Sequence, residues 1–208
     1  MWMDVLLIQG AGAGAHDADL ALAEGLRQAL GEGFRVHFPR MPGEGDPDKV
    51  LWTLSIADEA RRTNAHILVA HSAGAAITAD MLAQGLHRTV LPPLRAVVLL
   101  APPYIGRGGW DFEGYHLDLS ARHASLDGLP VHFYFGAEDA TVPLSHADLY
   151  AKAFPRATIH RLPNCDHQFA GRLVDVAKDL MDLAPARPTR RSERVAFRTG
   201  RRSRPAAP

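Results

Sequence analysis

The stretch Ile67-Leu68-Val69-Ala70-His71-Ser72-Ala73-Gly74 decides the fold class. Its apolar first half predicts a buried strand, and residues 75–82 predict a helix. Ser72 therefore falls on a sharp strand-to-helix turn, with small residues two positions before and after it. Such a turn would lift the serine hydroxyl out of the sheet edge, next to the helix N-terminus. The alternative is that Ser72 only caps the helix.

A carboxylate and a histidine follow later in the chain, each just beyond an expected strand. Asp139 comes after the strand expected at residues 130–135, and His167 lies in the loop after residues 157–161. Because ligands bind where the carboxyl ends of parallel strands meet, we expect both side chains to lie near Ser72. Serine as nucleophile, histidine as base and an acid that orients the base make a catalytic triad.

These motifs, in this order, resemble those of the α/β-hydrolase superfamily. The matching segments run from residue 3 to about residue 183: the turn at Ser72, Gly136-x-x-Asp139-x-x-Val142-Pro143, Asp166-His167 and a glycine-rich loop after the first strand. Ala70 stands where the family more often has glycine. The resemblance implies a carboxylesterase-like serine hydrolase. It would cleave a carboxylic ester, or a related thioester or amide, through an acyl-enzyme, with no metal or organic cofactor.

The glycine-rich loop at residues 10–16 follows the first expected strand. In the superfamily a histidine-glycine segment here gives one backbone N–H to the oxyanion hole. Gln9 replaces the histidine in this chain, which leaves the backbone role open. The resemblance implies that the N–H groups of Ala11 and Ala73 form the oxyanion hole, with Gly12 beside them in contact with substrate. One well-placed donor contributes about 2.7–4 kcal/mol to catalysis.

The same loop supports a rival hypothesis, because Gly10-x-Gly12-x-x-Ala15 matches a dinucleotide-binding fingerprint. That fold places an acid at the tip of the second strand to bind the ribose. The strand expected at residues 34–38 runs into Pro39 instead, and only Arg40 is nearby to accept a 2′-phosphate. The rival hypothesis also leaves the triad unexplained. A noncatalytic relative that uses the same cleft for binding is the other alternative.

Strands and helices alternate along the chain. We expect an α/β fold with a doubly wound, mainly parallel six-stranded sheet and helices on both faces, a minimal α/β-hydrolase fold. By the superfamily's pattern the spatial order of strands is second, first, third, fourth, fifth, sixth. The expected strands are residues 4–9, 34–38, 66–70, 95–100, 130–135 and 157–161. The expected helices are residues 17–30, 50–63, 73–86, 145–154 and 168–183.

Residues that contact substrate are harder to identify. Tyr104 and Trp110 belong to the segment 101–129, which either packs as a surface loop or lines an acyl pocket beside Ser72. Met41 follows the second strand and is a candidate for the opposite wall. His71 adjoins the nucleophile, although its side chain should point away from that of Ser72.

Each titratable group near the triad has a competing interpretation. Glu138 is an alternative to Asp139 as the acid, but Asp139 matches the family position. Cys165 lies in the histidine loop and not at the Ser72 turn, so we interpret it as a small buried apolar side chain rather than a nucleophile. We interpret Asp166 as a cap on the final helix rather than as the catalytic acid. A His–Asp–His zinc site is the least favoured alternative, because no His-x-x-x-His spacing falls on an expected helix, and we expect no metal.

The chain has 208 residues, which suits one domain with a sizeable core. We expect a hydrolase domain at residues 1–184 and a basic, disordered tail at residues 185–208. The tail has eight arginines, one glutamate and four prolines, so its net charge of +7 leaves −7 on the preceding part. A solvated extension is favoured over a tether to nucleic acid or an anionic membrane.

A single cysteine excludes an intrachain disulfide and fits a reducing cytoplasm. We see neither a signal peptide nor an apolar stretch long enough to cross a membrane. The expected partner is a small acyl substrate, with no nucleic acid and no membrane span. The sequence leaves the oligomeric state open.

Overall fold

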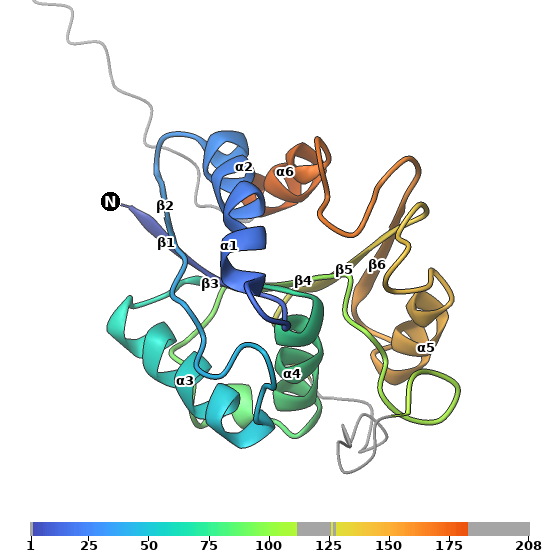
Figure 1. Ribbon diagram of the computed structural model, residues 1–208. Helices are drawn as coiled ribbons and strands as arrows, with labels where there is room; N and C mark the ends of the chain where they lie inside the picture. Colours follow the sequence, from blue (N-terminus) through green and yellow to red (C-terminus); the bar gives the residue numbers. More distant parts are fainter. Residues whose placement is uncertain (1, 112–125, 127, 183–208) are drawn as a thin grey trace, which may run out of the picture.

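The computed structural model describes residues 2–111, 126 and 128–182 of the chain. Within these residues the strands form one parallel sheet in the order β2-β1-β3-β4-β5-β6 (Figure 1). This confirms the expected fold class and strand order. The expected domain boundary at residue 184 and the basic tail lie outside the described residues.

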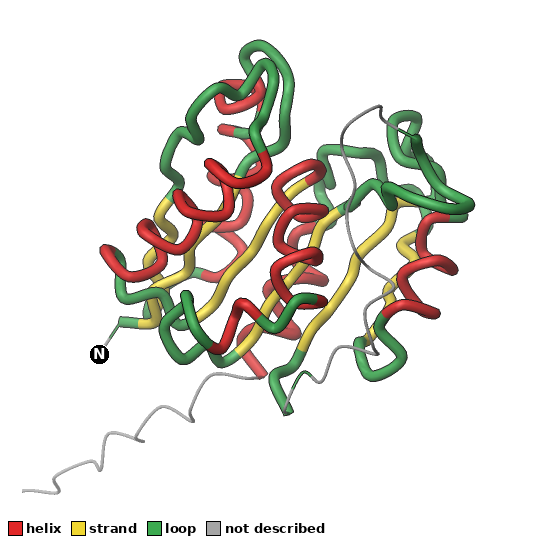
Figure 2. Tube along the Cα trace, turned by 90° about the horizontal axis from the view of Figure 1, so that it is seen from below, coloured by secondary structure: helices red, strands yellow, loops and turns green. Residues whose placement is uncertain are grey.

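The strands are short, and Figure 2 shows them lying side by side across the molecule. Strands β3 and β4 are buried along their whole length, as expected of apolar runs covered on both faces. The two edge strands, β2 and β6, are the least buried. The strand bounds are β1 (Met3–Ile8), β2 (Phe34–His37), β3 (Ile67–His71), β4 (Ala96–Leu100), β5 (Val131–Gly136) and β6 (Thr158–Leu162).

Helices cover both faces of the sheet. Alternate residues of β1 enter two separate cores: Val5 and Leu7 pack with α2 and α6, whereas Leu6 and Ile8 pack with α3, α4 and α5. The helix bounds are α1 (Ala15–Ala18), α2 (Leu20–Leu30), α3 (Lys49–Arg62), α4 (Ser72–Ala83), α5 (His146–Ala153) and α6 (Leu173–Asp182), with a 3-10 turn η1 (Leu86–Arg88).

Two helices differ from the expected bounds. The helix expected at residues 17–30 is divided into α1 and α2 at Asp19, whose side chain is buried and bonded to groups outside the helix. The helix expected to begin at residue 168 begins at Leu173. Before it, Phe169 is buried with φ 56°, a left-handed conformation that a helix cannot contain.

The strand order reverses between β1 and β3, since β2 lies on one side of β1 and all later strands lie on the other. In open parallel sheets ligands bind at such a switch point, beyond the carboxyl ends of the strands. The loop after β1 and the turn after β3 therefore face the same crevice. No helix in the described part of the chain is long and apolar enough to cross a membrane.

Candidate active site

The turn between β3 and α4 carries Ser72 as the first residue of the helix. Its backbone has φ 49°, in the left-handed region that non-glycine residues seldom adopt. Strain of this kind is concentrated at functional sites, where the surrounding structure holds it in place. The strained turn points the hydroxyl to the crevice at the switch point.

Gly74 allows this turn to pack closely. A Cβ added to Gly74 would lie 2.4 Å from the Gln9 carbonyl oxygen and 2.8 Å from Ile8 Cγ2. The first turn of α4 therefore packs against the end of β1. Ala70 is fully buried in the core, so its methyl group fits where glycine is more common.

A continuous chain of polar contacts joins Ser72, His167 and Asp139. Ser72 Oγ lies 3.2 Å from His167 Nε2, and His167 Nδ1 lies 2.8 Å from Asp139 Oδ2. The Asp139 side chain is 1% exposed and that of His167 is 17% exposed, so only the histidine end of the pair meets solvent. Residues 95 positions apart thus meet at one sheet edge.

Backbone amides fix the carboxylate of Asp139. Asp139 Oδ1 accepts hydrogen bonds from the N–H groups of Thr141 and Val142, at 2.7 and 2.8 Å. Burial alone would raise the pKa of Asp139, but the hydrogen bonds from His167 and from these amides outweigh it and lower the pKa below its ordinary value. Glu138 is exposed, so Asp139 is the acid that contacts the histidine.

Gly136 brings the acid loop against the histidine loop. A Cβ on Gly136 would lie 2.2 Å from the carbonyl oxygen of Cys165, which is backbone and cannot move aside. Glu138 N–H also donates to this carbonyl, at 3.0 Å. Cys165 itself is buried, and burial raises the pKa of its thiol to about 11, which agrees with a packing role.

In the loop after β1, the amides on either side of Ala11 donate to protein acceptors. Gly10 N–H donates to Asp19 Oδ2 at 2.8 Å, and Gly12 N–H donates to the Glu44 carbonyl at 2.6 Å. Between them, Ala11 N–H has no acceptor among the described residues. Ala73 N–H lies in the first turn of α4, where helix amides have no intrahelical partner.

The loop is close to the serine. A Cβ on Gly10 would lie 3.1 Å from Ser72 Cβ and 3.6 Å from its Oγ. The backbone before Ala11 therefore passes directly over Ser72. Both amides expected to form an oxyanion hole, those of Ala11 and Ala73, are thus on segments adjacent to the hydroxyl.

A cleft of about 280 Å³ lies over Ser72 and His167. One wall is the backbone of residues 10–15, which are only glycine and alanine, and the other includes Thr141 and Gln168. The remaining lining is polar, with Asp19 and His71 beside Ser72 and His167.

A family comparison agrees with this geometry. The sequence model of a family described as serine hydrolase matches residues 25–167. The chain belongs to the serine hydrolase family. No curated protein has significant sequence similarity to the chain.

Solved structures support the α/β-hydrolase fold of this serine hydrolase. A protein from Pectobacterium atrosepticum described as a YdeN-like hydrolase is 17% identical, with a TM-score of 0.60 over 88% of this chain and 94% of its own. Est1E from Butyrivibrio proteoclasticus, solved with ferulic acid, is 16% identical, with a TM-score of 0.61 over 86% and 88%. An esterase domain from Rhodothermus marinus is 16% identical, with a TM-score of 0.59 over 86% and 84%.

The cleft of this serine hydrolase includes only some of the residues expected to contact substrate. Gly12 and His71 line it, whereas Met41, Tyr104 and Trp110 do not. Met41 is 2% exposed and packs in the core.

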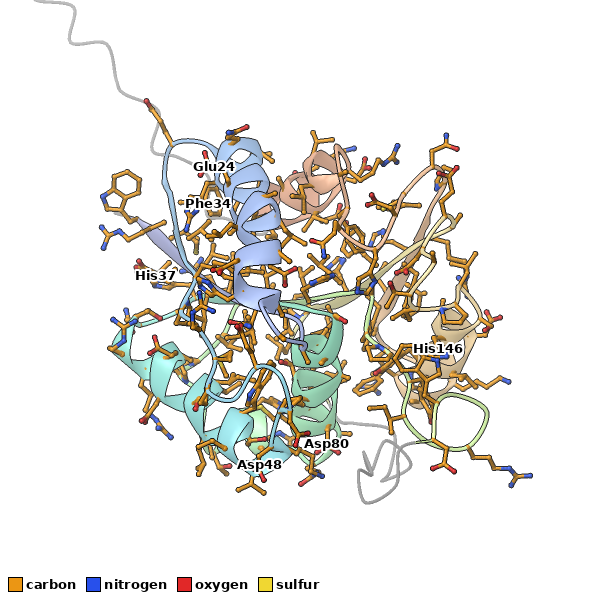
Figure 3. The ribbon with its side chains drawn as sticks, in the orientation of Figure 1. Glu24, Phe34, His37, Asp48, Asp80 and His146 are labelled. Carbon is orange, nitrogen blue, oxygen red and sulfur yellow. The ribbon has the colours of Figure 1, made fainter. Side chains whose placement is uncertain are left out.

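Tyr104 and Trp110 pack instead around His146, which Figure 3 labels on α5. Tyr104 N–H donates to His146 Nδ1 at 2.9 Å, and the Trp110 ring meets the His146 ring edge to face. This part of the 101–129 segment therefore forms a packed surface loop. Residues 112–125 lie outside the described residues.

Sequence reasoning missed Asp19, which lies under the active site of this serine hydrolase. Asp19 Oδ2 lies 2.8 Å from His71 Nδ1, and His71 Nε2 lies 2.9 Å from the carbonyl oxygen of His167. Burial alone would raise the pKa of Asp19, but the hydrogen bonds from His71 and Gly10 lower it. Asp19 and His71 thus form a buried, hydrogen-bonded pair.

The Asp19–His71 pair contacts both loops of the site. His71 binds the His167 carbonyl, and Asp19 accepts a hydrogen bond from the Gly10 amide. His71 does line the cleft, but both of its ring nitrogens are engaged with protein, so its main contacts are to Asp19 and His167. The only sequence signal for Asp19 was an acid at the start of an otherwise apolar helical pattern.

The dinucleotide hypothesis loses its physical basis in this structure. The fingerprint needs free loop amides to bind a pyrophosphate, but those of Gly10 and Gly12 already donate to Asp19 and Glu44. The Glu44 carboxylate also accepts from Gln9 and from His16 N–H, which brings negative charge to the helix start. A pyrophosphate would meet two carboxylates here.

Proposed function

We propose that this protein is a carboxylesterase that uses Ser72 as nucleophile, His167 as general base and acid, and Asp139 to orient the histidine. The observation that carries the proposal is the contact chain Ser72 Oγ–His167 Nε2–His167 Nδ1–Asp139 Oδ2, with spacings of 3.2 and 2.8 Å. Family membership and the esterase descriptions of two structural neighbours support it.

The polar contacts determine which proton moves. The Asp139 carboxylate accepts a hydrogen bond from His167 Nδ1–H, which leaves the Nε2 lone pair directed at the Ser72 hydroxyl. His167 therefore takes the hydroxyl proton as Ser72 Oγ attacks the ester carbonyl carbon. The buried Asp139 carboxylate then stabilises the imidazolium that forms.

The carbonyl oxygen becomes an oxyanion as the new C–O bond forms. The N–H groups of Ala11 and Ala73 stabilise it, the latter helped by the positive end of the α4 dipole. His167 returns its proton to the leaving alkoxide, and the ester C–O bond breaks to give an acyl-enzyme. Water then attacks the acyl-enzyme with His167 again as base, which regenerates Ser72 and releases the acid.

The cleft supports a small acyl group. Its volume of about 280 Å³ and its glycine and alanine wall leave little apolar surface for a long chain. We therefore propose short-chain carboxylic esters as the substrate class, ahead of long-chain thioesters and amides. A small-molecule partner and a cytoplasmic location stay predictions from the sequence.

Active-site labelling tests the proposal. A fluorophosphonate should add one adduct to the wild-type protein, seen by intact mass, and none to Ser72→Ala. A panel of p-nitrophenyl esters should then show highest kcat/KM for acetate or butyrate. If a folded wild-type protein forms no adduct, Ser72 is not an activated nucleophile, and the cleft serves binding instead. Turnover of only long-chain thioesters would contradict the substrate class alone.

A further inference from the structure

A second cluster of titratable side chains lies away from Ser72. His132 on β5, His160 on β6 and Asp179 on α6 each direct one ligand-type atom to a common point. All three side chains are half-buried, with exposed fractions of 16–29%. His132 is the second residue of β5, whereas Asp139 lies beyond the other end of that strand. The cluster is therefore separate from the proposed active site.

The contacts within this cluster are longer than those of the shortest histidine–carboxylate pairs. His160 Nε2 lies 3.3 Å and His132 Nδ1 lies 3.7 Å from Asp179 Oδ2. His37–Asp4, His71–Asp19 and His167–Asp139 lie at 2.8 Å, the usual distance for a charge-assisted hydrogen bond, whereas His16–Asp17 and His66–Asp4 lie at 3.4 and 3.9 Å. In the cluster the two ring nitrogens also lie 3.1 Å from each other, so three atoms of ligand type converge.

The same distances suit a bound cation. The three atoms are 3.1, 3.3 and 3.7 Å apart, so a point equidistant from them lies about 2.0 Å from each. Tetrahedral ligands at zinc's usual 2.0–2.1 Å lie about 3.3–3.4 Å apart. Adjacent octahedral ligands on magnesium would lie only about 2.9 Å apart. The mean of the observed spacings agrees with the tetrahedral value.

Neighbouring groups hold these side chains in place. Tyr134 OH donates to the same Asp179 oxygen, and the Tyr134 ring stacks on the His160 ring at 4.1 Å and 4°. Hydrogen bonds of this kind orient metal ligands in proteins.

We propose that His132 Nδ1, His160 Nε2 and Asp179 Oδ2 bind one Zn²⁺ ion, with water as the fourth ligand. Two imidazoles and one carboxylate are a donor set that zinc accepts. The ion would join α6 to β5 and to the edge strand β6, and the water would occupy an open fourth position. The ion lies outside the proposed esterase mechanism, and no step of that mechanism uses it.

Metal binding to the full-length protein tests this site. Protein stripped with a chelator and titrated with ZnCl2 by calorimetry should bind one Zn²⁺ per chain. His132→Asn and His160→Gln place an amide near the replaced ring nitrogen, so the fold should persist while affinity falls at least about 100-fold. Tyr134→Phe keeps the stacked ring and removes only the supporting hydrogen bond, so affinity should fall about 10–100-fold.

Two controls separate this cluster from other histidines. His37→Gln removes a different half-buried histidine–carboxylate pair, and His167→Gln removes the proposed catalytic base. Both variants should bind Zn²⁺ as the wild type does. If His167→Gln abolishes binding, or if His160→Gln binds normally, the proposed site is wrong. Equal affinity for Mg²⁺ would also overturn it.

Stability and spectroscopy give further readouts that do not depend on activity. At Zn²⁺ about one hundred times the dissociation constant, the unfolding midpoint of the wild type should rise by roughly 5–10 °C. It should not rise in His160→Gln. Co²⁺ in the site should give the intense visible absorption of a tetrahedral complex; weak octahedral bands, or no rise in midpoint, would contradict the proposal. Fluorophosphonate labelling of Ser72 should be unchanged in His160→Gln.

Discussion

At the scale of single residues, the buried pair of Asp19 and His71 has the largest expected effect. Their side chains are 3% and 2% exposed, and His71 binds the carbonyl of His167. Asp19→Asn weakens the buried hydrogen bonds from His71 and from Gly10 N–H to this side chain, which should lower the free energy of unfolding by about 1–3 kcal/mol. Urea unfolding measures this.

The same substitution should lower kcat more than it raises KM, because the pair positions His167 and the Gly10 amide rather than the substrate. Asp17→Asn is the matched control, since Asp17 is a neighbouring exposed acid. It should leave stability and kcat near wild type. If Asp19→Asn has the same free energy of unfolding and the same kcat as Asp17→Asn, the buried pair neither stabilises the fold nor positions His167, and the role we give it is wrong.

The lowered pKa of Asp139 makes stability depend on acid pH. A carboxyl group whose pKa is lower in the folded state stabilises that state fully above its unfolded pKa of about 3.9. This contribution is lost as the pH falls through the folded pKa. The free energy of unfolding should therefore decrease from about pH 5 downward, and less steeply in Asp139→Asn.

Urea unfolding at a series of pH values measures this slope. Asp58→Asn, which removes an exposed carboxylate, is the control and should keep the wild-type slope. An Asp139→Asn slope equal to wild type would show that the carboxylate gains no favourable contacts on folding.

The sequence was sufficient to predict that Ser72, Asp139 and His167 lie close together, because each follows a recognisable strand and matches a local motif. Their catalytic roles stay a proposal. Asp19 could not be predicted in this way. Its partner His71 is 52 positions away, and no local pattern reports that a helix breaks so that one carboxylate can turn inward. The residues that line the cleft could not be predicted either, because Tyr104 and Trp110 contact His146 on another element and do not reach the cleft.

At the scale of elements, Gly136 sets the distance between the end of β5 and the histidine loop. Gly136→Ala would place a methyl group 2.2 Å from the Cys165 carbonyl oxygen, so the two loops must separate. We expect a loss of about 3 kcal/mol or more in stability, at the upper end for overpacking because the neighbour is backbone. We also expect kcat to fall, because Asp139 and His167 lie on the separated loops.

Gly45→Ala is the matched control for this substitution. A Cβ there meets only Ala13 N at 3.9 Å, an ordinary contact, so its stability and kcat should stay near wild type. Chemical unfolding and ester hydrolysis measure both variants. A Gly136→Ala variant as stable and active as Gly45→Ala would show that the loops tolerate separation.

The bounds of a helix were predicted to within one residue where its hydrophobic periodicity agrees with its buried face, as for α3 and α5. The start of α6 was missed, because residues 166–172 form turns in which Asp166 Oδ1 accepts from Ala170 N–H. The histidine–aspartate cluster was also missed. His132, His160 and Asp179 come from three elements. The parallel register of β5 and β6, with Tyr134 opposite His160, brings the two histidines together, and the Tyr134 hydrogen bond to Asp179 links α6 to them.

At the scale of the whole molecule, the strand order was predictable because alternating strands and helices with right-handed crossovers allow few arrangements. That order alone places the loop after β1 beside the turn after β3. The side-chain contacts across this crevice could not be predicted, because they depend on tertiary packing that the hydrophobic periodicity of the sequence does not encode. Topology therefore located the site, while its detailed lining required the structure.

The positions of the proposed catalytic groups along the chain predict which part of the protein is needed for ester hydrolysis. All groups proposed for catalysis and for the oxyanion hole lie between residues 11 and 167, and the last described helix ends at Asp182. Deleting residues 185–208 should therefore leave kcat/KM for a short-chain ester within about twofold of the full chain, since no transition-state contact is removed. Circular dichroism should show the same unfolding midpoint within a few degrees. A truncated chain that folds normally but has lost its turnover would show that the arginine-rich segment takes part in substrate binding or catalysis, and our assignment of the whole site to the preceding residues would be wrong.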